Sequence, residues 1–358
     1  MKNTPTIEQI KSALTRVIDP ELHKNIVDLG MVHDIQIEEG HVKILLALTM
    51  QGCPMRNQLQ EQTQAAAASV AGVECVTVEL TTMTEAQRQQ LKDKLSPAAK
   101  FNRIGRLVAI MSGKGGVGKS SVTAMLASSL KRKGHSVGIL DADITGPSIP
   151  RLFGVSGPVR GVPMGILPVE SSSGIKVMST NLMLPEEDQA VIFRGPIMSS
   201  TIRQYWNDVL WGRLDYLLVD LPPGTSDATL TAMQSLPLDG VLMVTTPQSL
   251  SSMVVRKTVH MAQELKVPIF GIVENMSFFT CPETGIPHQI FGPSHTRAIS
   301  ELAGAPILAY LPIDPHMTHL ADTGKIEQYE HNAYQELTEV FIQHVPPREP
   351  APAPPWMA

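Results

Sequence analysis

The residues with the clearest chemical meaning lie in segment 113–120, which reads Gly-Lys-Gly-Gly-Val-Gly-Lys-Ser. This order fits the phosphate-binding pattern G-x-x-x-x-G-K-[ST]. Its glycines let the backbone fold so tightly that several N–H groups point at one phosphate chain. Lys119 would place a cation near the β- and γ-phosphates, and the Ser120 hydroxyl would bind Mg²⁺. We therefore expect an ATP site formed by Gly113, Lys114, Gly115, Gly116, Val117, Gly118, Lys119, Ser120 and Ser121.

The flanking residues supply the elements that such a loop needs. Residues 106–112 are a short apolar run suited to a buried parallel strand. Residues 120–133 have apolar side chains at helical spacing and lysines at the end, and Gly134 follows, as is typical of a helix C-terminus. A strand, a glycine loop and a helix N-terminus together make an anion site.

Carboxylates follow two further apolar runs. Asp141 and Asp143 follow residues 138–140, and Asp220 follows residues 217–219. Doubly wound sheets bind ligands at the carboxyl ends of their strands. Of the first pair, we expect one to hold Mg²⁺ through water and the other to orient the attacking water; Asp220 would contact the Mg²⁺ shell. Gly224, in a switch-like loop, could present its N–H to the γ-phosphate.

Asn275 and the cysteines allow two interpretations each. The Asn275 amide could read the adenine edge, or it could be a turn residue after a strand. Cys53 precedes Pro54 at an expected helix N-terminus, which would favour a reactive or metal-binding thiolate. A small buried cysteine is the other interpretation. Three scattered cysteines do not make a disulfide framework, which favours a reducing cytoplasm.

Composition argues against several classes of protein. Aromatic residues make up only 4% of the chain, which gives little support to a stacking platform for single-stranded nucleic acid. A net charge of −5 argues against a broad basic surface. No apolar run has the length of a membrane span, and the N-terminus has no secretory pattern. We therefore expect neither a nucleic-acid partner nor a membrane partner.

The chain divides by pattern into four parts. Residues 1–82 predict a small α/β domain, and residues 83–103 predict a linker. Residues 104–345 alternate strands with helices, which is the signature of a doubly wound, mostly parallel sheet, with an antiparallel hairpin expected between 157 and 180. Residues 346–358 are rich in proline and alanine and predict a disordered, unpacked tail.

Together these motifs resemble the Mrp/ApbC group of P-loop ATPases, relatives of MinD and ParA that carry iron–sulfur clusters. The N-terminal part is similar to a small domain found in iron–sulfur assembly factors, through Asp19-Pro20-Glu21, Asp28-Leu29-Gly30 and Gly52-Cys53-Pro54. The matching segments of the large part are 113–120, 141–150, 194–196, 215–225, 246–248 and 271–277.

The resemblance implies an ATP-hydrolysing homodimer that delivers [4Fe–4S] clusters to apo iron–sulfur proteins. It also implies that assembly factors are partners of this homodimer. In the deviant Walker A loops of such proteins, the lysine at the Lys114 position reaches the nucleotide of the partner subunit. The resemblance also implies that Lys119 and Ser120 bind phosphate and Mg²⁺. Asp143 is then expected to position the water and Asp141 to support Mg²⁺.

One departure from the family pattern concerns the cluster itself. The family usually has Cys-Pro-x-Cys, so that a dimer holds one cluster with four thiolates. Here the segment is Cys281-Pro-Glu-Thr284, and a hydroxyl is a poor ligand for a soft iron–sulfur centre. Cys281 could act with further ligands such as Cys53, His288 or Glu283, or the cluster could bind weakly and transiently. The alternative is a cluster-free dimeric ATPase switch that acts on a protein client.

A positioning or partition ATPase of the MinD/ParA type is the competing class. Such proteins need a membrane-seeking amphipathic helix or a basic DNA-binding face. The acidic balance and the Pro/Ala-rich tail supply neither. A nitrogenase-reductase-like electron donor is disfavoured because no cysteine follows the strand that ends at Asp220.

Overall fold

The structure is a computed structural model that describes residues 5–20, 24–38, 40–48, 55–84, 87, 98, 101–184 and 195–348. It divides into two compact units, Met1–Ser96 and Pro97–Ala358. Each unit is described separately. Most of the expected linker 83–103 lies outside the described residues, so its bounds stay a prediction.

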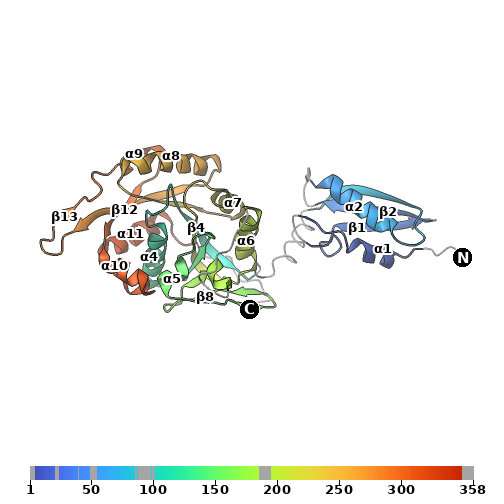
Figure 1. The fold of residues 1–358 in the computed structure, drawn as a ribbon, viewed down its shortest axis with the longest axis horizontal. Helices are drawn as coiled ribbons and strands as arrows, with labels where there is room; N and C mark the ends of the chain where they lie inside the picture. Colours follow the sequence, from blue (N-terminus) through green and yellow to red (C-terminus); the bar gives the residue numbers. More distant parts are fainter. Residues whose placement is uncertain are drawn as a thin grey trace. The chain divides into compact units, whose positions relative to one another are not determined.

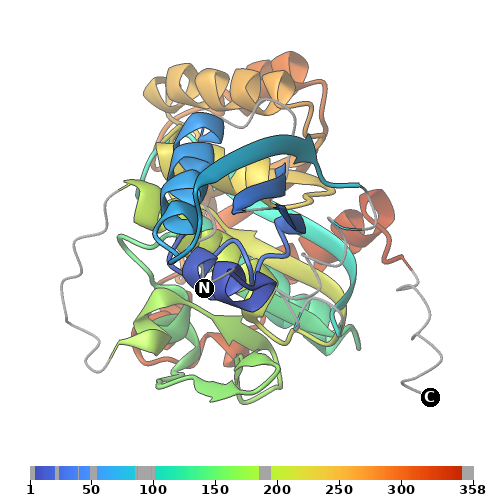
Figure 2. The same ribbon diagram turned by 90° about the vertical axis from the view of Figure 1, so that its right-hand side faces the viewer.

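The described residues of the small unit include helices α1 and α2 and a three-stranded sheet (Figure 2). Thr6 caps the first helix, because its hydroxyl accepts the N–H of Gln9 while the Gln9 side chain accepts the N–H of Thr6. The first two strands form an antiparallel hairpin, and the third runs parallel to the second. The elements are α1 (Ile7–Leu14), β1 (Val32–Glu38), β2 (His41–Leu48), α2 (Arg56–Ala68) and β3 (Cys75–Thr82).

The large unit is built on a nine-stranded sheet with the order β13-β12-β11-β4-β10-β5-β9-β8, in which β14 also pairs with β12. All pairs are parallel except β12–β13 and β8–β9, which confirms the predicted mostly parallel sheet. The strands are β4 (Arg103–Ser112), β5 (Val137–Asp141), β8 (Val169–Glu170), β9 (Lys176–Met178), β10 (Arg213–Asp220), β11 (Gly240–Thr245), β12 (Ile269–Thr280), β13 (Pro287–His288) and β14 (Ile307–Ile313).

Helices cover both faces of this sheet (Figure 1). One hydrophobic core joins the sheet to α4, α5, α10 and α11, and a second joins it to α6, α7, α8 and α9. Helices α8 and α9 lie side by side (Figures 1 and 2). The helices are α4 (Lys119–Arg132), α5 (Ile149–Phe153), α6 (Gly195–Asp208), α7 (Asp227–Ser235), α8 (Ser249–Glu264), α9 (Thr296–Ala303), α10 (Pro315–Asp322) and α11 (Asn332–His344), with 3₁₀ turns η2 (Thr180–Met183) and η3 (Ile326–Gln328).

Three details refine the predictions. The segment 157–180 contains the expected hairpin, formed by β6 (Arg160–Val162) and β7 (Gly165–Leu167). Strand β12 continues to Thr280, so Asn275 lies within the strand rather than in a turn after it. The start of the expected tail is packed rather than free, because the Arg106 side chain donates to the Pro346 carbonyl and Arg348 pairs with Asp239. Within the described segments, no helix is both long and apolar enough to cross a bilayer.

Candidate functional site

The candidate site lies where three neighbouring parallel strands end. Asp220, the last residue of β10, is the register partner of Asp141, the last residue of β5, and of Ile110 in β4 on its other side. Strand β4 runs directly into the glycine-rich loop, and α4 begins at Lys119. The sheet therefore brings the glycine-rich loop close to Asp141 and Asp220, which are far from it in the sequence.

The glycine-rich loop surrounds a cavity of about 220 Å³. Gly116 and Gly118 both have a φ of +77°, a conformation that favours glycine. This geometry curls the loop around the cavity at the N-terminus of α4, which is suited to an anion. The wall is formed by Ser112, Lys114, Gly115, Gly116, Val117, Gly118, Lys119, Ser120, Ser121, Asp143 and Pro223.

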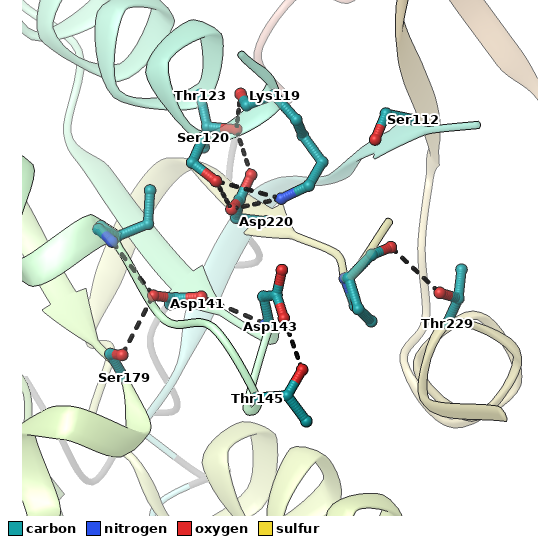
Figure 3. A network of polar contacts seen from close by, with 12 residues as sticks. Ser112, Lys119, Ser120, Thr123, Asp141, Asp143, Thr145, Ser179, Asp220 and Thr229 are labelled. Atoms are coloured by element: carbon teal, nitrogen blue, oxygen red, sulfur yellow. Dashed lines mark hydrogen bonds and ion pairs between the residues drawn. The ribbon is translucent and has the colours of Figure 1, made fainter. Parts of the chain in front are cut away.

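Three donors from α4 converge on the carboxylate of Asp220 (Figure 3). The Lys119 Nζ lies 2.6 Å from Oδ2, and Ser120 Oγ donates to the same oxygen at 2.6 Å. Thr123 Oγ1 donates to Oδ1 at 2.6 Å. Asp220 is fully buried and Lys119 is 6% exposed, so the pair is shielded from water. Thr123 lies outside the loop motif, although its position one helical turn after Lys119 places it on the same face.

Asp141 and Asp143 lie in different environments. Asp141 is fully buried, accepts the N–H of Ile149 at 3.2 Å and the Ser179 hydroxyl at 3.1 Å, and does not line the cavity. Burial, followed by the charge of Asp220, raises the pKa of Asp141 to about 8. Asp143 lines the cavity and accepts the Thr145 hydroxyl at 3.2 Å. Burial also raises the pKa of Asp143. Of the two, Asp143 is the carboxylate that faces the cavity.

Two groups expected to meet a nucleotide have protein partners in this structure. Lys114 Nζ donates to Gln248 Oε1 at 3.1 Å, directly before α8. The Gly224 N–H donates to the Ser112 carbonyl at 2.8 Å. A nucleotide phosphate would have to compete with both partners. Gln248 is a residue whose contact with the loop the sequence alone did not reveal.

Gly113, at the start of the loop, and Asn275 are not part of the cavity wall. A Cβ on Gly113 would lie 2.8 Å from the Val255 backbone nitrogen, so this glycine allows α8 to pack closely. Asn275 is 2% exposed, and its Nδ2 donates to the Val117 carbonyl at 2.9 Å. Its Oδ1 is buried without a hydrogen-bond partner among the described residues. Adenine recognition by Asn275 therefore stays a prediction.

Cys281 follows the last residue of β12, at the turn that leads into β13. The Cys281 N–H donates to the Ile286 carbonyl, and the Cys281 carbonyl accepts the N–H of Gly285. The pKa of the Cys281 thiol is lowered by hydrogen bonds from the Thr284 hydroxyl, the Thr284 N–H and the Glu283 N–H. Cys53 lies outside the described residues. Within the described residues, no cluster of three or more His, Cys, Asp or Glu side chains could hold a metal ion.

Two known protein families match this chain. Residues 103–345 match the family described as NUBPL iron-transfer P-loop NTPase. The chain belongs to this family. As an iron-transfer P-loop NTPase it carries an additional module, because residues 7–80 match the family described as iron–sulfur cluster assembly protein. Both matches agree with the resemblance seen in the motifs.

Individual relatives of this iron-transfer NTPase cover most of its length. A protein of Synechocystis sp. named iron–sulfur cluster carrier protein is 39% identical over 94% of this chain and 96% of its own length. A Methanocaldococcus jannaschii protein of the same name is 46% identical over 63% of this chain and 78% of its own length.

Solved structures of similar proteins confirm the fold. A nucleotide-binding protein from Archaeoglobus fulgidus, in complex with ADP, is 42% identical and matches with a TM-score of 0.60 over 67% of this chain and 94% of its own. The cell division ATPase MinD from Pyrococcus furiosus, at 22% identity and a TM-score of 0.51, covers 67% of this chain and 99% of its own. The MinD likeness shows the fold alone.

Proposed function

We propose that this iron-transfer P-loop NTPase is an ATP-hydrolysing carrier that binds iron–sulfur clusters and transfers them to apoproteins. The observation that carries the proposal is the presence, in one chain, of an iron-transfer NTPase match and an iron–sulfur assembly match. The name iron–sulfur cluster carrier protein, which the Synechocystis and Methanocaldococcus relatives share, supports it. We further propose that the carrier acts as a homodimer in the cytoplasm and receives its cargo from assembly factors.

The described residues suit nucleotide hydrolysis with Mg²⁺. Ser120, Asp141 and Asp220 offer hydroxyl and carboxylate oxygens, which are the donors that Mg²⁺ prefers. Bound there, the ion would neutralise charge on the phosphates. Lys119 would bind the phosphate chain, and Asp143 would orient the attacking water from the cavity wall. Lys114 would act across the dimer after release from Gln248.

The cargo site is proposed at Cys281. Cys281 is partly exposed and the turn residues that follow it are exposed, and the lowered pKa of its thiol favours the thiolate that ligates iron. One thiolate per subunit gives a dimer two, so we propose that further ligands, with Cys53 as a candidate, complete the set for a cluster of the [4Fe–4S] type.

Anaerobic reconstitution with iron and sulfide tests this proposal. Wild type is expected to hold iron and sulfide in stoichiometric amounts, and Cys281→Ala is expected to lose them. Loss in Cys53→Ala would identify the small unit as a second source of ligands, with Cys75→Ala as the matched control. Absence of a cluster from wild type with intact ATP hydrolysis would overturn the carrier and favour a cluster-free switch.

A further inference from the structure

One buried carboxylate of the large unit takes no part in the nucleotide site described above. Glu274 is 1% exposed and lies in β12, immediately before Asn275. Its side chain accepts hydrogen bonds from the Ser277 hydroxyl at 2.8 Å and from the hydroxyls of Ser294 and Thr296. Within the described part of the chain it forms no ion pair. Because a buried carboxylate without a cation is costly, this arrangement of hydroxyl donors calls for an explanation.

The donors belong to the two arms of the cysteine hairpin, which are residues 277–280 of β12 and residues 287–296 after the turn that contains Cys281. Ser277 lies in β12, on the arm that leads to Cys281. Ser294 follows β13 on the returning arm, and Thr296, at the end of that arm, is the first residue of α9. A single carboxylate therefore joins both arms at the base of the hairpin.

Strand β12 is irregular at the same place. Glu274 is the register partner of Tyr310 in β14, and Phe278 is the partner of Pro312, so four residue steps along β12 match two along β14. Met276, inside this bulge, has a φ of +59°, which is uncommon for a residue with a side chain. The Ser277 hydroxyl also donates to the Glu274 carbonyl at 2.9 Å, which closes the bulge.

The bulge lies between the phosphate-binding loop and the cysteine. On one side, Asn275 donates to the Val117 carbonyl, and a Cβ on Gly118 would lie 2.3 Å from the Asn275 Nδ2. On the other side, Phe279 and Thr280 pair with β13 and lead directly to Cys281. A shift of Val117 and Gly118 on nucleotide binding would therefore act on the Asn275 amide, and Asn275 directly follows Glu274 in the strand.

We propose that Glu274 is a positioning residue that couples nucleotide binding at the loop to the reactivity of the Cys281 thiol. The carboxylate holds both arms of the hairpin to the strand position next to Asn275. A change in the contact between Asn275 and the loop then moves the hairpin as one piece. The inference rests on the proposed nucleotide site but not on the proposed cluster.

The test measures the alkylation rate of Cys281 by iodoacetamide, with the modified peptide identified by mass spectrometry, with and without ATP and Mg²⁺. In wild type, nucleotide is expected to change this rate by about fivefold or more, the lower range of coupling between sites. Glu274→Gln keeps the shape of the side chain but replaces one acceptor oxygen with a donor. This variant is expected to bind ATP as wild type does and to lose the nucleotide dependence of alkylation.

Glu327→Gln is the matched control, because the Glu327 carboxylate also accepts three serine hydroxyls, from Ser171, Ser172 and Ser173, and lies outside the nucleotide cavity. It is expected to respond to ATP as wild type does. If Glu274→Gln does not fold, Ser294→Ala, which removes one donor and leaves the carboxylate, is expected to weaken the response.

Two results would overturn the inference: a nucleotide response in the folded Glu274 or Ser294 variant equal to that of wild type, or no response in a wild-type protein that binds ATP. Alkylation requires no iron, so these results are independent of cluster binding. Failure of reconstitution would count against the carrier function and leave the coupling intact.

Discussion

Asp141 and Asp220 are register partners at the ends of β5 and β10, yet only Asp220 has a cation in hydrogen-bond contact. Lys119, Ser120 and Thr123 all bind the Asp220 carboxylate. Asp141 receives a serine hydroxyl and backbone N–H groups. The two carboxylates therefore end neighbouring strands but have different hydrogen-bond partners.

The burial of Asp141 predicts how stability depends on pH without nucleotide. The pKa of Asp141 rises from 3.8 to about 8 on folding, so the folded protein binds more protons than the unfolded chain in this range. Stability due to Asp141 is fully present below pH 3.8 and is lost as the pH rises toward about 8, by at most about 1.4 kcal/mol per pH unit.

The measurement compares urea unfolding of wild type and Asp141→Asn at several pH values in this range. The difference between the two unfolding free energies should shrink, or change sign in favour of the variant, as the pH rises. A difference that stays constant with pH would mean that Asp141 is already ionised in the folded protein. Bound Mg²⁺ should favour the ionised form and reduce the effect.

Removal of the Lys119 ammonium should destabilise the large unit as well as abolish hydrolysis. Lys119→Met leaves the Asp220 carboxylate buried without its cation, which typically costs about 3–5 kcal/mol. Trp206 and Trp211 both lie in this unit, so their fluorescence can follow its unfolding. Lys133→Met is the control, because Lys133 pairs with Glu339 at the surface and should cost about 1 kcal/mol or less. Equal effects of the two variants would contradict the structure.

Release of Lys114 from Gln248 should promote the dimeric form. Gln248→Ala removes the oxygen that Lys114 contacts within its own subunit. Half-maximal ATP hydrolysis per chain should then occur at a lower protein concentration than in wild type. Lys114→Ala should bind ATP but lose the increase of hydrolysis with protein concentration. If Lys114→Ala keeps that increase, the lysine does not act between subunits.

The Thr284 hydroxyl should lower the pKa of Cys281. Thr284→Val keeps the shape of the side chain but removes the hydrogen bond to the thiol, so the pKa of Cys281 should rise. The midpoint of the pH dependence of Cys281 alkylation would move upward accordingly. Thr280→Val, in the same hairpin, should leave the midpoint in place. An unchanged midpoint in both variants would show that Thr284 does not tune the thiol.

Sequence patterns could predict the sheet and the loop, because strand periodicity, glycine spacing and carboxylates at strand ends are local signals. They could not separate Asp141 from Asp143, since burial depends on how η2 and α5 cover the strand end. Asn275 was expected after a strand, but β12 continues past it through a bulge that is set by pairing with β14. The partners of Lys114 and Glu274 come from distant segments, which no local pattern shows.

The most direct test of the carrier is the transfer of its cluster to an acceptor. Protein reconstituted with iron and sulfide is mixed, with and without ATP, with an apo iron–sulfur enzyme whose activity requires a [4Fe–4S] cluster. The account predicts that the acceptor gains activity as the wild-type carrier loses iron, and that Cys281→Ala prepared in the same way gives no such gain. Equal activation by wild type and Cys281→Ala, or none by a fully loaded wild type, would contradict it.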